Sequence, residues 1–280
     1  MTAVTDASGT APAPGAPGEG TGRGPVAGPR PARAHRLRRP GLVGLVVQPL
    51  AIAAALGAFA IWLATADLTA GERTTLDPAR ILDYTGEHLA LTFASAAIVL
   101  VIALPLGVVL TRAPFRRASG PILAVANFGQ AAPAIGLVVL LASWLGFSFR
   151  AAVVALVLYA ILPVLRNTMI GLQSVDARLV EAGRGMGMSA TAVLFRVELP
   201  LAVPVMLSGI RTALVLLVGS AALATFIGAG GLGLLITTGV NLFLPRVLVS
   251  GALLIALLAL LIDWLGRVVE YVARPKGLRA

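Results

Sequence analysis

The stretch SVDARLVEAGRGMGMSATAVLFRVELPLAVP, residues 174–204, is a polar segment that lies between two apolar runs and has the pattern of folded structure. Asp176 suits the N-cap of a short helix over 177–186, because its carboxylate can accept hydrogen bonds from the first free N–H groups. Gly185 and Gly187 can end that helix, since glycine adopts the left-handed conformation of a C-cap at little cost. The segment therefore begins with a helix and a glycine turn.

A second short helix is predicted directly after this turn. Ser189 can cap a helix over residues 190–197, and Pro200 and Pro204 suit the start of the following span, where a missing N–H costs little. Two short helices rigidly joined to a membrane span would form a lever that a partner could grip and move. Periodicity alone equally allows an amphipathic helix that lies on the membrane surface.

The composition places this segment in a membrane protein. The chain of 280 residues is 58% hydrophobic and 12% charged, with a mean hydropathy of +0.93. A soluble domain is nearer half apolar and a quarter charged. Because the chain has no cysteine, disulfides, thiolate metal sites and cysteine nucleophiles are excluded. Its two histidines, His35 and His88, are too few and too scattered for a metal cluster, so we expect no metal and no cofactor.

Six apolar runs are candidates to cross the bilayer, which takes about 20 residues of helix. They cover residues 41–66, 88–110, 121–145, 149–165, 204–227 and 247–265. Basic and non-basic segments alternate between them, and Lys and Arg mark the cytoplasmic side. The alternation favours six spans over five or seven. We therefore expect an all-α, polytopic plasma-membrane protein with both termini in the cytoplasm.

The first 40 residues differ from the rest of the chain. Residues 1–40 are rich in Gly, Pro and Ala, have almost no large apolar side chains and end in a basic cluster. Such a segment cannot bury enough surface to fold, so we expect a disordered cytoplasmic tail before a membrane domain over 41–280. The first apolar run exceeds the roughly 7–15 residues of a signal peptide, which indicates a retained helix.

The stretch GAGGLG, residues 228–233, matches the G-x-G-x-x-G spacing of a dinucleotide-binding loop. That loop needs a strand before it, a helix after it and an acidic residue about 20 positions later. Here an apolar span comes first, and residues 250–254 hold no acid. We therefore predict a flexible re-entrant turn on the outer side of the membrane, where glycine lets the backbone pack closely.

A polar interruption in the third apolar run is a candidate translocation path. In ANFGQAAPAIG, residues 126–136, Asn127 and Gln130 would be costly if they faced lipid, and Pro133 breaks the backbone ladder near mid-span. A helix–helix hydrogen bond explains the amides equally well. Tyr159 could lie beside such a path, although a packed aromatic is the commoner role.

Charged residues in the last two spans suggest simple local roles. Asp263 and Arg267 are four positions apart, the spacing of an ion pair on one helix face. For Arg211, about two turns into its span, extension to the cytoplasmic surface is favoured over pairing with an acid.

Within the quoted stretch, EAG at Glu181, Ala182 and Gly183, then a glycine six residues after the Glu, then VELP, form a motif that resembles the EAA loop of binding-protein-dependent ABC importer permeases. Gly183 replaces the second alanine of that pattern, and glycine weakens a helix by about 1 kcal/mol relative to alanine. The likeness extends roughly over 88–267. LPVLRNTMIGLQSVD, RVELPLAVPVMLSGIRTA and IGAGGLG are similar to the osmoprotectant branch, which imports glycine betaine, carnitine and choline.

The resemblance implies a type I ABC importer (MetI-like) permease fold with a core over 88–267. It implies that a cytoplasmic ATPase dimer grips the loop over 174–204, that a second permease subunit, identical or related, completes the channel, and that membrane lipid surrounds the pair. A separate extracytoplasmic protein would deliver the solute, because the chain stops about a dozen residues after the last span. The coupling residues would be Glu181, Ala182, Gly183, Gly187, Ser189, Leu199 and Pro200.

Other functions have weaker support. The chain lacks the phosphate-binding pattern G-x-x-x-x-G-K-[ST], so ATP would be hydrolysed by a partner and not by this chain. A permease for another small solute, such as an amino acid, is the nearest alternative. An ion-coupled secondary transporter should show inverted repeats and acids deep in its spans. The 3 Trp and 3 Tyr form no cluster that would cage a quaternary ammonium, which places selectivity mainly in the binding protein. Nothing indicates a nucleic-acid partner.

Overall fold

The computed structural model describes residues 42–273, so the predicted tail over 1–40 lies outside the described residues. Within that range the regular elements are all helices, with no strand. They are α1 (Leu42–Thr65), α2 (Ala70–Thr75), α3 (Pro78–Leu110), η1 (Arg116–Ala118), α4 (Ser119–Ala131), α5 (Ala134–Leu145), α6 (Phe149–Gln173), α7 (Ala177–Gly185), α8 (Ala190–Val193), η2 (Leu194–Glu198), α9 (Leu199–Ala221), η3 (Ala222–Ile227), α10 (Gly233–Asn241) and α11 (Pro245–Ala273). The all-α prediction is confirmed.

Long apolar helices make up most of the described chain. Within residues 42–273, five are long and apolar enough to cross a membrane: α1, α3, α6, the continuous run from α8 through α9, and α11. The helices α4 and α5 pass the same test only as a pair, and their axes differ by 99°. The described residues therefore give five crossings, and the expected six only if this bent pair counts as one crossing.

The bend follows from Pro133. Ala132 is extended, with φ −64° and ψ 144°, because a residue before proline is pushed out of the helical region. Helix α4 has 13 residues, or about 20 Å, which is shorter than the roughly 30 Å hydrocarbon core. The predicted interruption of the backbone ladder at Pro133 is thus confirmed.

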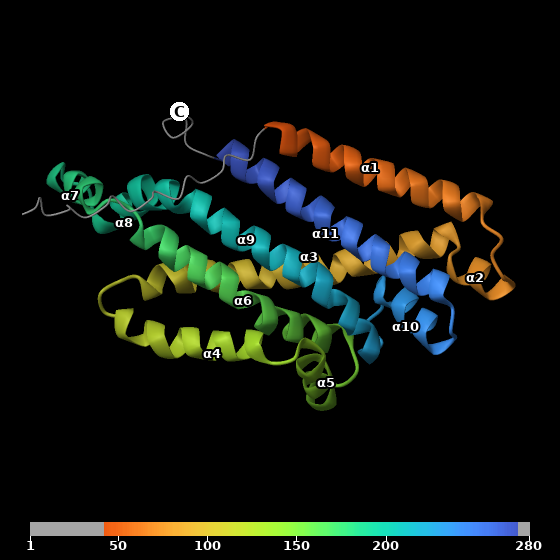
Figure 1. Cartoon of the computed structure of the whole chain (residues 1–280). Helices are drawn as coiled ribbons and strands as arrows, with labels where there is room; N and C mark the ends of the chain where they lie inside the picture. Colours follow the sequence, from red (N-terminus) through yellow and green to blue (C-terminus); the bar gives the residue numbers. More distant parts are fainter. Residues whose placement is uncertain (1–41, 274–280) are drawn as a thin grey trace, which may run out of the picture. The chain divides into compact units, whose positions relative to one another are not determined.

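Helix α6 lies at the centre of the bundle, where it packs against α3, α4, α5 and α9 (Figure 1). Of its apolar window 61% is buried, against 33% for α3 and α11. It crosses α9 closely at Gly209, where an added Cβ would lie 2.5 Å from Asn167 Cβ and 2.7 Å from the Pro163 carbonyl oxygen. Small residues allow such close backbone approach, which is how helices gain packing energy in lipid.

Helices α1 and α11 run antiparallel and are joined at both ends. At one end Trp264 Nε1 donates to the Leu45 carbonyl at 2.8 Å, and Gln48 Nε2 donates to the Leu260 carbonyl at 3.0 Å. At the other end Arg246 donates to the Asp67 carbonyl at 2.6 Å. These polar contacts attach α1, which is otherwise the least buried of the five long helices.

The segment before α3 is more ordered than predicted. Helix α3 begins at Pro78, with Asp77 as its N-cap, and not near residue 88. Before it, α2 opens with a capping box, in which Thr69 N–H donates to Glu72 Oε2 at 2.8 Å. That backbone hydrogen bond, the Thr69 hydroxyl and the nearby Arg246 guanidinium together hold the pKa of Glu72 below its ordinary value, against a smaller opposing effect of burial.

Helices α9 and α11 meet at a group of charges. Arg211 lies 3.7 Å from Asp263 and 3.5 Å from Glu270, so the expectation that it extends to the surface unpaired was wrong. Close packing explains the pairing: an added Cβ at Gly266 would lie 2.8 Å from Arg211 Cγ, so glycine leaves room for the arginine stem. The predicted Asp263–Arg267 pair is confirmed, with a 3.0 Å bond from Arg267 Nε.

Candidate functional site

Helix α7 and its glycine turn form the first half of the candidate coupling segment, which we define as residues 174–204. Asp176 Oδ1 accepts from Arg178 N–H at 2.9 Å, which confirms the predicted N-cap. Gly187 is left-handed at φ +82°, and its N–H donates to the Arg184 carbonyl at 2.9 Å. Gly185 remains the last residue of α7, so Gly187 alone supplies the left-handed C-cap conformation.

The second half differs from the expected separate helix over 190–197. Ser189 Oγ accepts from Ala192 N–H at 3.2 Å, as predicted for an N-cap. Helix α8 then passes without a break into the π-helical turn η2 and on into α9. Pro200 cannot donate to the carbonyl four residues back, and the wider turn instead bonds Leu199 N–H to the Leu194 carbonyl. The coupling segment is therefore continuous with a membrane span.

The residues of the EAA-like motif differ in their exposure on this segment. Glu181 and Ala182 are exposed on α7, whereas Gly183 is buried against α8. A Cβ at Gly183 would lie 3.3 Å from Val193 Cγ2, so the glycine lets α7 and α8 approach. Leu199 is half-buried and Pro200 exposed where α9 begins.

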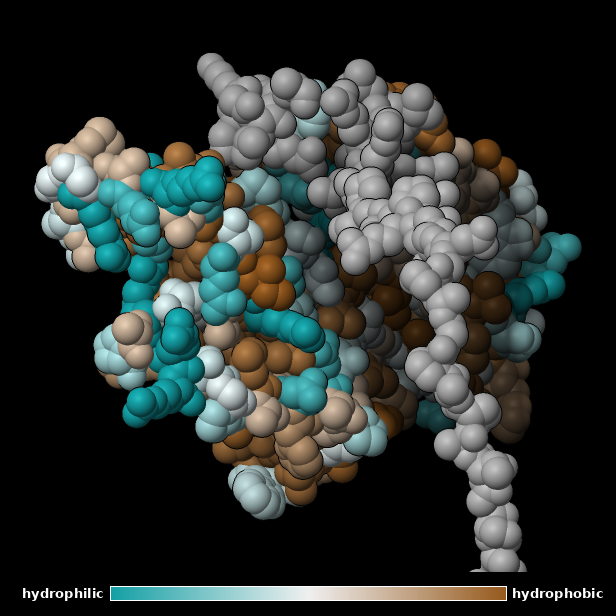
Figure 2. Space-filling model, turned by 60° about the vertical axis from the view of Figure 1, so that its left-hand side comes forward, coloured by the Kyte–Doolittle hydropathy of each residue, from teal (hydrophilic) through white to brown (hydrophobic). Residues whose placement is uncertain are grey.

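The coupling segment forms one end of the described bundle. Figure 1 shows α7 and α8 beyond the ends of α3 and α6, with α2 and α10 at the opposite end. Figure 2 turns the coupling end toward the viewer and shows hydrophilic side chains gathered there beside hydrophobic surface. Three apolar side chains are nevertheless exposed on the segment: Leu179, Met186 and Phe195. An exposed mixture of charge and apolar side chains suits a protein partner.

An ion pair that sequence reasoning missed fixes the base of the coupling segment. Arg112, just after α3, donates to both carboxylate oxygens of Glu198, at 3.2 and 2.5 Å. Glu198 belongs to η2 and is only 7% exposed. The partners are 86 residues apart, and the motif allows any residue at position 198, so no local pattern could have shown the contact.

The glycine-rich turn over 228–233 is held in place at the opposite end of the bundle. Gly228, Gly230 and Gly231 all have positive φ, between +73° and +91°. Gly231 N–H donates to Glu87 Oε2 at 2.8 Å, and the Thr225 hydroxyl donates to the Gly230 carbonyl at 3.1 Å. The predicted glycine turn is present, and these two hydrogen bonds link it to α3 and η3. The Gly231 N–H group, which a bound phosphate could otherwise accept from, already donates to the Glu87 carboxylate.

His88 anchors the same end of α3. Its ring is fully buried, and Nε2 lies 2.9 Å from the Val218 carbonyl oxygen. The Val218 carbonyl is near the end of α9, where Ala222 N–H donates to the Ser220 carbonyl and not to the carbonyl four residues back, which is that of Val218. The histidine therefore satisfies a helix-end carbonyl, a role that its sequence position did not indicate.

The candidate path residues lie on and beside the bent pair α4–α5. Asn127 and Pro133 are exposed, while Gln130 and Tyr159 are half-buried. An added Cβ at Gly129 would lie 2.9 Å from the Leu158 carbonyl oxygen, so the segments that carry Gln130 and Tyr159 are neighbours. Neither amide side chain hydrogen-bonds to any residue in the described range. The helix–helix bond offered as an alternative is thus not seen within this part of the chain.

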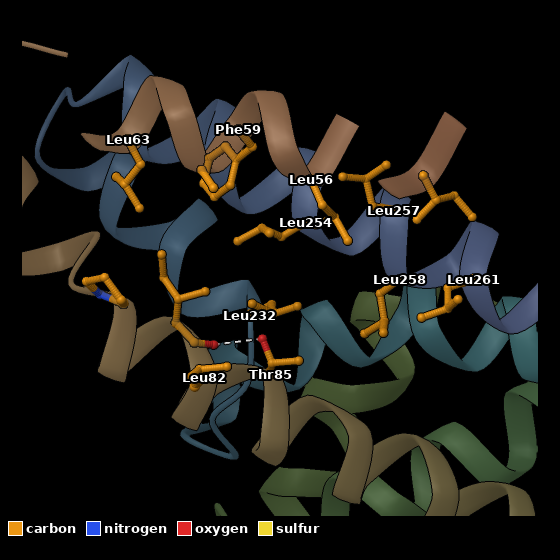
Figure 3. Close-up of a pocket in the computed structure, with 14 residues that line it drawn as sticks. Leu56, Phe59, Leu63, Leu82, Thr85, Leu232, Leu254, Leu257, Leu258 and Leu261 are labelled. Carbon is orange, nitrogen blue, oxygen red and sulfur yellow. Dashed lines mark hydrogen bonds between the residues drawn. The ribbon is translucent and has the colours of Figure 1, made fainter. Parts of the chain in front are cut away.

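A cavity of about 460 Å³ between α1, α3 and α11 has a different chemistry. Figure 3 shows leucines around it, with Phe59 as the one aromatic ring among its lining residues. The Thr85 hydroxyl is turned to the Ile81 carbonyl of its own helix at 2.7 Å. With hydrocarbon walls and no charged lining residue, the cavity offers nothing to orient a charged solute. Within residues 42–273 no group of three His, Asp or Glu could hold a metal.

Apolar helices long enough to cross a bilayer, one of them continuous with a protruding helical hook formed by α7 and α8, define a membrane protein that presents a helical segment at one end. Residues 103–271 match the family of binding-protein-dependent transport system inner membrane components, and the chain belongs to this family. It is a multi-pass transport permease subunit.

Curated relatives and solved structures agree with this assignment. The chain is 39% identical to the glycine betaine/carnitine/choline transport system permease protein OpuCB of Bacillus subtilis, over 71% of this chain and 91% of the relative. It is 42% identical to the osmoprotectant import permease protein OsmW of Salmonella typhimurium, over 70% and 92%. An inward-facing structure of the MetNI methionine ABC transporter matches with a TM-score of 0.61 at 27% identity, covering 70% of this chain and 97% of that one.

Proposed function

We propose that this chain forms the membrane channel of an ABC importer for small osmoprotectants such as glycine betaine, carnitine or choline. The observation that carries the proposal is the identity of 36–42% with permeases whose names specify these solutes or osmoprotectants. The likeness extends over about seven-tenths of the chain. The family match over residues 103–271 includes the coupling segment and the glycine-rich turn.

ATP drives this permease through the coupling segment. A cytoplasmic ATPase dimer grips the exposed face of α7 around Glu181 and Ala182, with Met186 and Phe195 as apolar contacts. Gly183, Gly187, Ser189, Leu199 and Pro200 shape the segment and do not themselves meet the ATPase. Because α8 continues into α9, a force on the hook moves a membrane span directly.

Orientation and partners follow from this role. The coupling end faces the cytoplasm, and both termini belong to that side, since α1 begins and α11 ends toward it (Figure 1). The opposite end, with α2 and the glycine-rich turn, receives solute from a separate extracytoplasmic binding protein. A second permease, identical or related, completes the channel across from this chain.

Residues of the bent pair line the path. Irregular backbone at membrane depth is tolerated where it is buried in protein or lines a water-filled cavity. The break at Pro133 and the two amides of Asn127 and Gln130, which lack partners among the described residues, fit such a lining, with Tyr159 on the neighbouring helix. The described aromatic pair, Phe59 and Trp62, stacks at 5.9 Å on α1, away from this path. Selectivity for a quaternary ammonium therefore resides mainly in the binding protein.

An amino acid is the second candidate solute. The match to a methionine transporter favours it, but at 27% identity against 36–42% for the osmoprotectant permeases. Uptake can decide between the two solute classes directly.

The test is uptake of radiolabelled glycine betaine, carnitine, choline and methionine by cells that carry the whole transporter, at low and high osmolarity. Wild type is compared with Glu181→Lys and with Arg116→Glu, a matched charge reversal at an exposed position outside the coupling segment. We expect osmoprotectant uptake that Glu181→Lys abolishes and Arg116→Glu retains, with equal amounts of complex in the membrane. Methionine uptake without osmoprotectant uptake would reject the proposed solutes.

A further inference from the structure

The contact between Arg112 and Glu198 joins two parts of the chain that have separate tasks. Arg112 follows Thr111, the C-cap of α3, and its guanidinium meets Glu198 as a two-pronged fork. Such bidentate pairs fix the orientation of both partners as well as their distance. The end of α3 is therefore held to the base of the coupling segment in one geometry.

The position of Glu198 gives this contact a mechanical meaning. It is the last residue of η2, the π-helical turn through which the hook passes into α9. Single π-turns inside helices occur frequently at functional sites. The Glu198 carboxylate is therefore bound at the junction between the hook and the span.

We propose that Arg112 and Glu198 clamp α3 to the coupling segment, so that α3 moves with the hook when ATP drives the transport cycle. The proposal rests on the ATP-coupled function stated above and identifies two positioning residues for it. The pair stays closed through the cycle, because opening it would leave the buried Glu198 carboxylate without its cation.

The clamp has a consequence at the far end of α3. That helix also carries Glu87, which binds Gly231 N–H in the glycine-rich turn. From Glu87 to its last residue, Leu110, α3 rises through 23 residues, or about 35 Å, and Arg112 follows two residues later. The helix α3 thus connects the coupling segment with the turn at the opposite end.

The test uses the whole transporter in proteoliposomes, with two readouts: solute uptake and binding-protein-stimulated ATP hydrolysis. The variants are Arg112→Gln, Glu198→Gln and the exchange Arg112→Glu with Glu198→Arg. Arg116→Gln, a neighbouring exposed arginine in η1, is the matched control. We expect each single change to lower uptake per ATP hydrolysed about tenfold, within the usual range of coupling between sites. The exchange should recover most of that ratio, and the control should keep it.

A second measurement follows the clamp itself. Because the chain has no cysteine, spin labels can be placed at Arg116→Cys and Ala190→Cys alone, on exposed positions beside α3 and on the hook and outside the proposed ATPase contacts. A moving clamp predicts one narrow distance distribution that is the same with and without ATP, and a broadened one in Glu198→Gln. A wild-type distance that changes with ATP, or single variants with an unchanged uptake ratio, would overturn the proposal. If wild type imports none of the solutes, the proposed solutes fail, while the distance measurement still decides on the clamp.

Discussion

Alanine substitutions of single glycines in the turn over 228–233 can distinguish the cost of left-handed backbone strain from the cost of losing the hydrogen bond between Glu87 and Gly231. Gly228 and Gly230 are both left-handed, at φ +73° and +80°. An added Cβ meets nothing within 4 Å at Gly228, but at Gly230 it would lie 2.3 Å from Glu87 Oε2. Left-handed backbone costs a residue with a Cβ about 1–2 kcal/mol, so both variants should lose that much stability.

Gly230→Ala should lose more, because Glu87 must move away and give up its hydrogen bond to Gly231. Hydrogen bonds to charged groups contribute about 1.5–3 kcal/mol, and the exposure of Glu87 places this one at the lower end. The assay is thermal unfolding of the purified transporter in detergent, where about 1 kcal/mol shifts the midpoint by about 2–4 °C for a chain of this size.

A Glu87→Ala background supplies the control. It should remove the difference between the two glycine variants while leaving the loss at Gly228 unchanged. Equal losses for Gly228→Ala and Gly230→Ala in the wild-type background, or a difference that persists without Glu87, would refute the assignment of the carboxylate as the anchor of the turn.

Three further perturbations test other parts of the structure. Gly209→Ala should destabilise the transporter by about 1–3 kcal/mol in the same unfolding assay, because its Cβ would lie 2.5 Å from a side-chain carbon of α6. As a control, the Cβ of Gly219→Ala on the same helix meets nothing within 4 Å, so this variant should gain up to about 1 kcal/mol of stability. Similar changes in stability at both sites would contradict the close crossing of α9 and α6. Folding lowers the pKa of Glu72 below its ordinary value of 4.5, so the stabilising contribution of the Glu72 carboxylate is complete at neutral pH and is lost as the pH falls through the folded-state pKa. Glu72→Gln should therefore lose less stability than wild type between neutral pH and pH 4 in unfolding scans. Parallel curves of stability against pH for the two proteins would count against this role of Glu72. Replacing Asn127 and Gln130 together by leucine should lower solute uptake while binding-protein-stimulated ATP hydrolysis persists, and unchanged uptake would remove both residues from the path.

The local signals in the coupling segment were sufficient to predict much of its structure. Asp176 and Ser189 are N-caps, and Gly187 takes the left-handed conformation that ends α7. Such features depend on neighbouring residues along the chain, which is why a single sequence reveals them. The continuity of α8 with α9 was not predicted. The prolines at 200 and 204 were interpreted as the start of a new helix, whereas in the structure a π-turn carries the helix past Pro200.

Contacts between distant segments could not be predicted in the same way. Arg112 and Glu198 are 86 residues apart, and Arg211 meets acids that only the packing of α9 on α11 brings near. Pairing in these cases depends on which helices become neighbours, which hydropathy does not specify. The same holds for the carboxylate of Glu87 at Gly231, 144 residues away.

The bend in the third apolar run was predicted only in part, and the short helix α10 was not predicted. Pro133 identified the position of the break, but its 99° angle depends on how α4 and α5 pack around α6. Helix α10 has 9 residues, or about 14 Å, too short to appear as a separate apolar run. Its packing on α11 relies on Gly239, where an added Cβ would lie 2.5 Å from Leu248 N.

The central claim is that the exposed face of α7 is gripped by a cytoplasmic ATPase. The natural absence of cysteine allows a direct measurement of that contact. A single cysteine is placed at Glu181 or, as a control, at Asp83, and a photo-activated thiol-specific cross-linker is added to membranes that contain the whole transporter. We expect a cross-link to the ATPase from position 181 and none from position 83. Cross-linking from position 83, or none from position 181 in an assembled and active complex, would contradict the claim.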